Sequence, residues 1–275
     1  MLAFGALLFA MMAAPAVSRA DTLAETEREQ QALFERIAPS VVVITTGGGM
    51  GSGFFVSRNG LVLTNAHVVG KSKEVDVVLL DGRKLRGVVV EKAASDIDLA
   101  LVKLELEGTV PLRLGGGELR VGMWAAAIGH GMGGVWAFTT GMVSNIYPMG
   151  STKPVFQTQI PLNPGTSGGP VFGRDGRVLG IVTSGIKESN SINFAIRAEV
   201  AVDNLQTLAN SCESCLVVSA PAGVPVFIDG KMAGKGPRVV IVPEERTYTI
   251  FAIIKGNKRE ITVSVPAQMA VDLGN

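Results

Sequence analysis

The sequence has 275 residues, of which 47% are apolar and only 18% charged. It can therefore bury a large core, which excludes global disorder and favours one or two domains. Without residues 1–20, which contain Arg19 and no acid, basic and acidic residues balance at 24 each. This balance gives no electrostatic case for nucleic acid or an anionic membrane as a partner.

Residues 1–20 have the pattern of a secretory signal peptide. Residues 1–18 carry no charge, and the apolar run Leu2–Val17 is followed by the small residues that a signal peptidase reads around Ser18-Arg19-Ala20. No Lys or Arg precedes the run, and its length is close to that of a membrane span, so an uncleaved anchor is the alternative. We expect an exported protein, in the periplasm or outside the cell.

Residues 21–39 predict an N-terminal helical segment. Leu23, Leu33, Phe34 and Ile37 fall loosely on one helical face, and Pro39 ends the pattern.

From Val41 onward, short Val- and Ile-rich runs alternate with turn signals, which is typical of strands. Six runs of this kind suit one small antiparallel barrel: Val41–Thr45, Gly53–Ser57, Leu61–Thr64, Val75–Leu79, Leu85–Glu91 and Leu99–Leu104. Six more predict a second barrel: Trp124–Ile128, Ala137–Val143, Val155–Gln159, Val171–Phe172, Val178–Ser184 and Ile192–Ile196. Ala198–Leu208 predicts a closing helix. The fold class is therefore all-β, with one domain over residues 40–210 and a second strand-rich module over 216–275.

Cys212 and Cys215 are the only cysteines, spaced as C-x-x-C at the junction of the two domains. A local disulfide, a redox pair and half of a metal site are all open readings. A four-ligand zinc site is disfavoured, because the only histidines are His67 and His130.

Three segments carry the parts that peptide-bond cleavage by a hydroxyl requires: a nucleophile, a base to take its proton and an acid to orient the base. An apolar strand delivers His67, Asp98 opens another strand, and Ser167 lies on a tight glycine-flanked turn. We expect the Gly165 and Ser167 amides to form the oxyanion hole. Asp96 is the alternative acid, while Trp124 and Trp136 are expected to pack in a barrel.

These segments resemble the catalytic blocks of the HtrA (Deg) serine proteases: Thr64-Asn65-Ala66-His67-Val68-Val69, Asp98-Leu99-Ala100-Leu101 and Asn163-Pro164-Gly165-Thr166-Ser167-Gly168-Gly169-Pro170. Supporting blocks are also similar: Gly51-Ser52-Gly53-Phe54, Val121-Gly122, Ala127-Ile128-Gly129, Thr140-Gly141-Met142-Val143-Ser144 and Asn193-Phe194-Ala195-Ile196. The resemblance covers residues 33 to 208. It departs at Gly129-His130-Gly131, where the family usually has an Asn-Pro-containing loop, and we expect no catalytic role for His130.

The resemblance implies a trypsin-like double β-barrel with its active site in the cleft between the barrels. It places the substrate pocket along Ile192, Asn193, Phe194 and Ala195 and the loop 183–191. Apart from Glu188 in that loop, no acidic residue is evident at the base of the pocket. The resemblance therefore implies aliphatic or small residues before the cleaved bond. It also implies trimers, which residues 21–37 could mediate.

Residues 216–275 are similar to the PEGA module, a small β-sandwich, where many HtrA proteins have PDZ domains. The turn that names that module reads Pro221-Ala222-Gly223-Val224 here, so the match is partial, and Asp229-Gly230 predicts a hairpin turn. The resemblance implies attachment to a cell-surface or envelope partner. A passive lid that stabilises the protease is the alternative.

The sequence thus predicts an exported serine endopeptidase that acts on polypeptide substrates and needs no cofactor or metal, with a role in envelope quality control or processing. The competing hypothesis is a catalytically silent trypsin-like fold that serves as a surface or partner-binding module.

Overall fold

The structure is a computed structural model that describes residues 19–94, 96–115, 119–131, 134–146, 154–185, 193–212 and 215–274. Residues 1–18 of the predicted signal peptide lie outside the described residues, as do Ile192 and Glu188 of the predicted substrate pocket.

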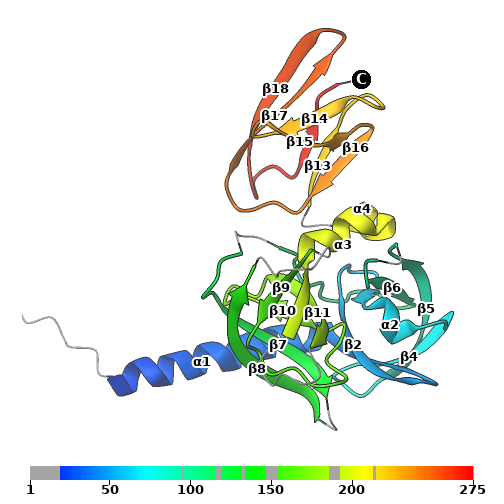
Figure 1. Ribbon diagram of the computed structural model, residues 1–275, viewed down its shortest axis with the longest axis vertical. Coiled ribbons are helices and arrows are strands. Elements are labelled where there is room, and N and C mark those ends of the chain that lie inside the picture. Colours follow the sequence, from blue (N-terminus) through cyan, green and yellow to red (C-terminus); the bar gives the residue numbers. More distant parts are fainter. Residues whose placement is uncertain are drawn as a thin grey trace, which may run out of the picture.

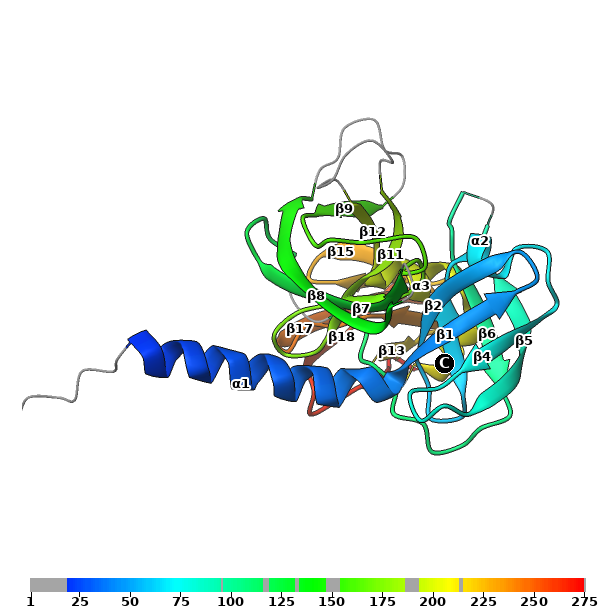
Figure 2. The same ribbon diagram turned by 90° about the horizontal axis from the view of Figure 1, so that it is seen from below.

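The N-terminal segment is a helix, α1 (Arg19–Ile37), that ends in a 3₁₀ turn, η1 (Ala38–Ser40). Only its last turns lie against the barrels, where Leu33 and Ile37 are buried and Phe34 packs edge-on to Phe138. The rest of the helix projects from the barrels (Figure 2). Leu23 is accordingly 65% exposed, so the expectation that it shares the packed face is not met.

The first barrel is closed in the order β1-β2-β3-β6-β5-β4. Its strands are β1 (Val41–Thr46), β2 (Gly49–Phe55), β3 (Leu61–Thr64), β4 (Glu74–Val78), β5 (Lys84–Lys92) and β6 (Ala100–Leu104), with a one-turn helix, α2 (Ala66–Val69), after β3. Alternate residues such as Val42, Ile44 and Val102 fill its interior, as the twofold side-chain period of strands requires.

The second barrel is closed in the order β10-β11-β12-β9-β8-β7. Its strands are β7 (Trp124–Gly131), β8 (Gly134–Asn145), β9 (Val155–Thr158), β10 (Pro170–Phe172), β11 (Val178–Gly185) and β12 (Asn193–Arg197). The barrels share a continuous core, in which Phe54 and Leu63 of the first meet Ile128 and Phe172 of the second. The expected pair of barrels is confirmed.

The helix predicted over Ala198–Leu208 is instead two helices, α3 (Ala198–Asn204) and α4 (Gln206–Ser211). Leu205 separates them with an extended backbone, φ −124° and ψ 102°, and its side chain is buried. The break is stabilised from outside, because the Glu91 carboxylate accepts hydrogen bonds from the backbone N–H groups of Gln206 (2.7 Å) and Thr207 (2.8 Å). These are the amides that a helix start leaves unpaired.

The C-terminal strands form two sheets, β16-β13-β19 and β15-β14-β17-β18. The strands are β13 (Leu216–Ser219), β14 (Pro225–Ile228), β15 (Lys231–Lys235), β16 (Arg238–Ile241), β17 (Thr247–Ile254), β18 (Asn257–Ser264) and β19 (Ala270–Asp272). Val218 of one sheet and Ile250 of the other belong to one core, so the sheets form a small sandwich. Asp229 and Gly230 both have positive φ, as expected of the predicted hairpin turn.

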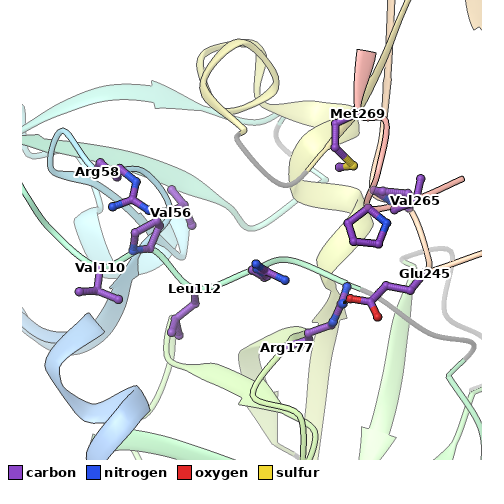
Figure 3. A pocket seen from close by; sticks show the side chains of 12 residues that line it. Val56, Arg58, Val110, Leu112, Arg177, Glu245, Val265 and Met269 are labelled. Carbon is purple, nitrogen blue, oxygen red and sulfur yellow. Dashed lines mark hydrogen bonds and ion pairs between the residues drawn. The ribbon is translucent and has the colours of Figure 1, made fainter. Parts of the chain in front are cut away.

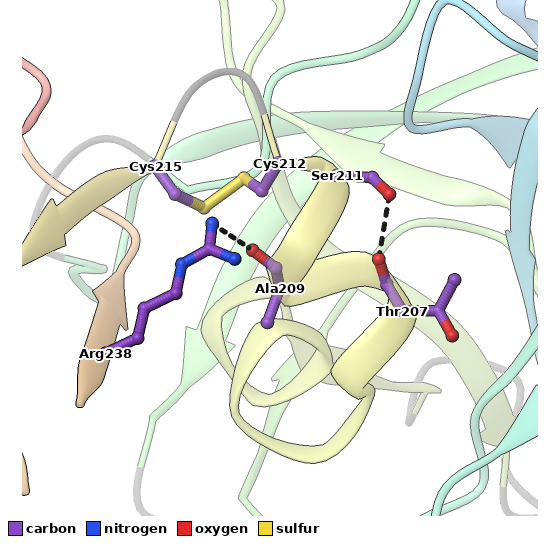
Figure 4. Close-up of a disulfide and its surroundings, with 6 residues drawn as sticks. All are labelled: Thr207, Ala209, Ser211, Cys212, Cys215 and Arg238. Carbon is purple, nitrogen blue, oxygen red and sulfur yellow. Dashed lines mark hydrogen bonds between the residues drawn. A yellow bond between two sulfur atoms is a disulfide. The ribbon is translucent and has the colours of Figure 1, made fainter. Parts of the chain in front are cut away.

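The sandwich lies over α3 and α4 (Figure 1), and specific contacts hold it there. The Arg238 guanidinium donates to Asn210 Oδ1 at 2.8 Å and to the Ala209 carbonyl at 3.4 Å, and Arg177 forms an ion pair with Glu245. Gly115 approaches so closely that an added Cβ would lie 2.3 Å from Val242 Cγ1. A Cys212–Cys215 disulfide closes the junction (Figure 4).

Candidate active site

His67 is presented at the rim of the first barrel by the short turn of helix that follows β3. Its side chain is 51% exposed, and its Nδ1 lies 2.6 Å from Asp98 Oδ2. The backbone N–H of the same residue donates to Asp98 Oδ1 at 2.9 Å. Both oxygens of one carboxylate therefore fix the backbone and the ring of a single histidine.

Asp98 lies two residues before the start of β6 and is half-buried, whereas Asp96 is exposed. Burial raises the pKa of the Asp98 carboxyl, but the hydrogen bonds from His67 outweigh burial, and the pKa falls below its usual value. Asp98 is thus held as the anion that can orient an imidazole and stabilise its protonated form.

Thr183, in β11, begins the loop 183–191 that was assigned to the substrate pocket, but its contacts with the acid and the serine were not predicted from the sequence. Its hydroxyl donates to Asp98 Oδ2 at 2.8 Å, and its carbonyl accepts a hydrogen bond from Ser167 Oγ at 3.1 Å. One residue of the second barrel therefore contacts both the acid of the first barrel and the serine. Only the three-dimensional structure reveals these two contacts, because no local sequence signal indicates which residues Thr183 touches.

Ser167 lies on a turn that only glycine can shape. Gly165 has φ +103°, and an added Cβ would lie 2.0 Å from the His130 carbonyl oxygen. Gly168 has φ +85°, and an added Cβ would lie 2.1 Å from the Ser52 carbonyl oxygen. Both positions combine a positive φ with close backbone approach, so a side chain at either would distort the turn.

His67 and Ser167 line the same cleft of about 700 Å³, together with Pro164 and Gly165. Among the described residues, no hydrogen bond joins Ser167 Oγ to the His67 ring, because the hydroxyl is directed to the Thr183 carbonyl. The structure therefore brings the base and the serine to one cleft without closing the bond between them.

The Gly165 and Ser167 amides have no hydrogen-bond acceptor within the part of the chain that the structure describes. The neighbouring Thr166 amide, by contrast, donates to the Asn163 carbonyl at 3.0 Å. The two amides predicted for an oxyanion hole are thus available donors beside the cleft.

His130 is fully buried behind this turn, in a network with Ser52. Ser52 Oγ donates to the Gly165 carbonyl at 2.8 Å, accepts the His130 backbone N–H at 3.1 Å and lies 2.9 Å from His130 Nδ1. Because the hydroxyl proton points to Gly165, Nδ1 must carry the ring proton, which leaves Nε2 as an acceptor with no partner in the described structure. Burial lowers the pKa of His130 to about 4.

Both tryptophans pack as expected. Trp136 lies edge-on to the His130 ring at 4.6 Å, and its Nε1 donates to the Val41 carbonyl of the first barrel at 3.0 Å. Trp124 packs beneath the Arg174 guanidinium.

Of the residues predicted to form the substrate pocket, the three that the structure describes, Asn193, Phe194 and Ala195, do not reach the cleft with their side chains. Asn193 is buried, and its Nδ2 donates to the Ile160 carbonyl at 2.8 Å. Ala195 is fully buried, and Phe194 packs against the core between the barrels. None of the three lines the cleft that holds His67 and Ser167.

No group of three or more His, Cys, Asp or Glu side chains among the described residues could hold a metal ion. No helix within the same residues has both the length and the apolarity to cross a membrane.

Two closed six-stranded barrels with an Asp–His pair and a serine turn at their junction define the trypsin-like class of peptidases. Residues 51–181 match the family described as trypsin-like peptidase domain. Within this class the barrel region is of the HtrA/DegP type, as the following relatives indicate.

A DegP-like periplasmic serine endoprotease of Halomonas elongata is 40% identical over 168 residues, which cover 58% of this chain and 35% of that protein. Its counterpart in Pseudomonas fulva is 37% identical over 184 residues, 62% of this chain and 38% of that one. The chain thus spans about a third of the length of these relatives.

Solved structures of proteases of this type are also similar to the chain. The crystal structure of Deg5 is 31% identical, with a TM-score of 0.57 over 67% of this chain and 95% of that chain. The serine endoprotease from Yersinia pestis shares the fold, with 21% identity and a TM-score of 0.59 over 86% of this chain and 96% of that chain.

Proposed function

We propose that the chain is a serine endopeptidase that cleaves polypeptides through an acyl-enzyme, with Ser167 as nucleophile, His67 as general base and Asp98 as the orienting acid. The observation that carries the proposal is the double hydrogen bond between Asp98 and His67, at 2.6 and 2.9 Å, in a cleft that Ser167 also lines. Residues 40–210 would form the protease domain and residues 216–275 a separate PEGA-like module.

The first step needs Ser167 Oγ to turn from the Thr183 carbonyl to His67 Nε2. Such a change is a rotation about one side-chain bond between staggered positions. Nδ1 of His67 must carry a proton toward Asp98, which leaves Nε2 free to accept the serine proton. Oγ then attacks the carbonyl carbon of the scissile bond, and the imidazolium passes the proton to the departing amine.

The second requirement is stabilisation of the oxyanion that forms during attack. The Gly165 and Ser167 amides are the donors we assign to it, since both lie at the cleft without an internal acceptor. An oxyanion-hole donor is typically worth a factor of about 10² to 10³ in kcat. Gly165 depends for its orientation on the hydrogen bond from Ser52 Oγ.

The cellular role follows from the relatives, whose names place them in the periplasm. We infer that this chain is also exported and acts on exposed polypeptide segments in envelope quality control or processing. The projecting half of α1, with Leu23 exposed, is the surface we assign to self-association into a trimer.

The chemistry is tested by labelling the purified protein with a fluorophosphonate probe. We expect wild-type protein to be labelled once per chain and Ser167→Ala to lose the label completely, with unchanged far-ultraviolet circular dichroism. Thr166→Ala is the matched control on the same turn and should still be labelled.

Label that persists in Ser167→Ala would remove Ser167 as the nucleophile. A folded wild-type protein that neither reacts with the probe nor degrades casein would favour the competing hypothesis, a silent trypsin-like fold used for binding.

A further inference from the structure

His130 is a fully buried histidine behind the serine turn, and the proposed mechanism gives it no task. It lies near the end of β7 in the second barrel, and its Nδ1 is 2.9 Å from Ser52 Oγ of β2 in the first barrel. His130 does not line the cleft, and its ring has no other hydrogen-bond partner in the described structure. Any effect of the ring on the reaction therefore passes through Ser52.

Ser52 holds both residues whose amides we assign to the oxyanion hole. Its backbone N–H donates to the Ser167 carbonyl at 2.8 Å, and its hydroxyl donates to the Gly165 carbonyl at 2.8 Å. The Gly165 carbonyl lies in the chain between the two amides, so rotation of its planar peptide unit would redirect them. The direction of one hydroxyl group is thus a condition for the site that we propose.

The ring of His130 fixes this direction through its tautomer. The Ser52 hydroxyl has one proton to donate, and it already accepts the His130 backbone N–H at 3.1 Å. A ring protonated at Nδ1 donates to Oγ and leaves the hydroxyl proton for Gly165. A ring without that proton would present Nδ1 as an acceptor, which would compete with Gly165 for the hydroxyl proton.

Two unfavourable features accompany this arrangement. Nε2 of His130 is a buried acceptor that has no partner in the described part of the chain, which costs free energy. Trp136, which packs edge-on to the ring at 4.6 Å, has φ +51°, a strained backbone conformation for a bulky residue. Strain of this kind persists where the surrounding structure enforces it, and it clusters at active sites. Both features favour a role for the ring in the reaction rather than in stability alone.

We propose that His130 is a positioning residue for the oxyanion hole, whose Nδ1–H holds the Ser52 hydroxyl on the Gly165 carbonyl. The two amides of the serine turn are thereby kept directed into the cleft. The inference rests on the proposed function, because these amides act only if Ser167 attacks a carbonyl group. His130 itself contacts no reacting atom.

The first test compares His130→Asn with His130→Leu in the full chain. The two side chains have nearly the same shape, but only asparagine has an N–H₂ group that can replace the Nδ1–H donor. We expect His130→Leu to lower kcat for a peptide substrate by about 10- to 100-fold, approaching the loss of one oxyanion-hole donor. His130→Asn should stay within about threefold of wild type, and KM should change by less than about twofold in both variants, because the interaction acts in the transition state.

The second test removes the residue through which His130 acts. Ser52→Ala loses the hydroxyl but keeps the backbone N–H that holds Ser167. Adding His130→Leu to Ser52→Ala should lower kcat by no more than about a further twofold, because residues in one hydrogen-bonded network are not additive. Losses of kcat that multiply fully in the double variant would overturn the proposal.

Leu112→Ala is the control for lost stability. Leu112 is 7% exposed and lines a separate cavity of about 290 Å³ between the barrels and the C-terminal sandwich (Figure 3). This cavity shares no lining residue with the cleft in the described structure. The substitution should lower the midpoint of urea denaturation and leave kcat of the folded protein unchanged. Equal losses of kcat in Leu112→Ala and His130→Leu would assign the effect to stability and overturn the proposal.

The tautomer of His130 gives a readout that does not depend on activity. Nuclear magnetic resonance of protein with ¹⁵N-labelled histidine distinguishes a protonated ring nitrogen from an unprotonated one, and His67→Gln leaves His130 as the single ring to assign. We expect the proton on Nδ1 at pH 7, and a proton on Nε2 instead would overturn the proposal.

The two proposals can fail separately. Wild-type protein that neither hydrolyses the peptide nor reacts with the fluorophosphonate probe would overturn the proposed function, whatever the tautomer of His130. Active wild-type protein with equal kcat in His130→Asn and His130→Leu would overturn this inference alone.

Discussion

At the scale of single residues, Asp98 decides which ring nitrogen of His67 holds a proton. Both carboxylate oxygens accept from His67, and an asparagine would present an N–H₂ group to one of those bonds. We expect Asp98→Asn to fold normally but to lower kcat by about 10⁴, because the imidazole would adopt the wrong tautomer.

The measurement is the steady-state hydrolysis of a peptide substrate. Asp96→Asn, two residues away and exposed, is the matched control and should retain most of the activity. A larger loss in Asp96→Asn than in Asp98→Asn would reverse the assignment of the acid.

His130 gives a prediction about stability and pH. The pKa of His130 is lowered to about 4 in the folded protein by burial, while an unfolded histidine titrates near 6.5. Between these values the unfolded chain binds the extra proton, so stability falls as pH is lowered, by up to about 3 kcal/mol in total. Urea denaturation at pH 7, 5.5 and 4.5 measures this slope.

His130→Gln lacks the titrating ring and should have a shallower slope over the same range, although it is less stable at pH 7. Identical slopes for wild type and His130→Gln would show that His130 is not the group responsible.

The sequence was sufficient to predict that His67, Asp98 and Ser167 lie in one region, because each residue belongs to a short local motif. It was not sufficient to predict the contacts made by Thr183, Ser52 and His130. Ser52 and His130 lie 78 positions apart in the sequence, and the Thr183–Asp98 bond joins the two barrels. Such pairs have no local signal, since the strand pairing alone creates them.

At the scale of elements, strand positions were predictable because Val- and Ile-rich runs and turn residues punctuate the chain regularly. The division of the closing helix into α3 and α4 was not, because nothing in the sequence around Leu205 breaks a helix. The cause lies on β5, where Glu91 accepts the first two amides of α4.

Removal of this carboxylate tests the explanation. We expect Glu91→Ala to destabilise the protein by about 1–2 kcal/mol, as the loss of a helix cap does. The measurement is the midpoint of urea denaturation, and Glu107→Ala, at an exposed acid on the same barrel, should change it by less than about 0.5 kcal/mol. Equal effects of the two substitutions would contradict the capping role.

At the scale of the whole molecule, the sequence predicted two barrels and a sandwich but not how the sandwich docks. That geometry depends on surfaces, such as the approach of Gly115 to Val242, which no motif encodes. We expect Gly115→Ala to weaken the contact between the sandwich and the barrels. The added methyl group would collide with Val242, and Gly115 has a φ of +63° that alanine rarely adopts. Limited proteolysis between residues 205 and 216 should become faster.

Gly108→Ala is the matched control, since Gly108 also has a positive φ, +73°, but an added Cβ meets nothing within 4 Å. It should add the same backbone strain without releasing the sandwich. Faster cleavage in both variants to the same degree would mean that strain, not contact with Val242, sets the docking.

Ser52 belongs to the first barrel, but it is hydrogen-bonded to the turn of the second barrel that holds Ser167. Its N–H donates to the Ser167 carbonyl at 2.8 Å, and its hydroxyl donates to the Gly165 carbonyl. Neither barrel alone therefore contains the complete proposed active site. We expect a small separation of the two barrels to abolish the reactivity of the proposed site under conditions in which each barrel is still folded. The rate of labelling by a fluorophosphonate probe should consequently report on how tightly the two barrels are associated.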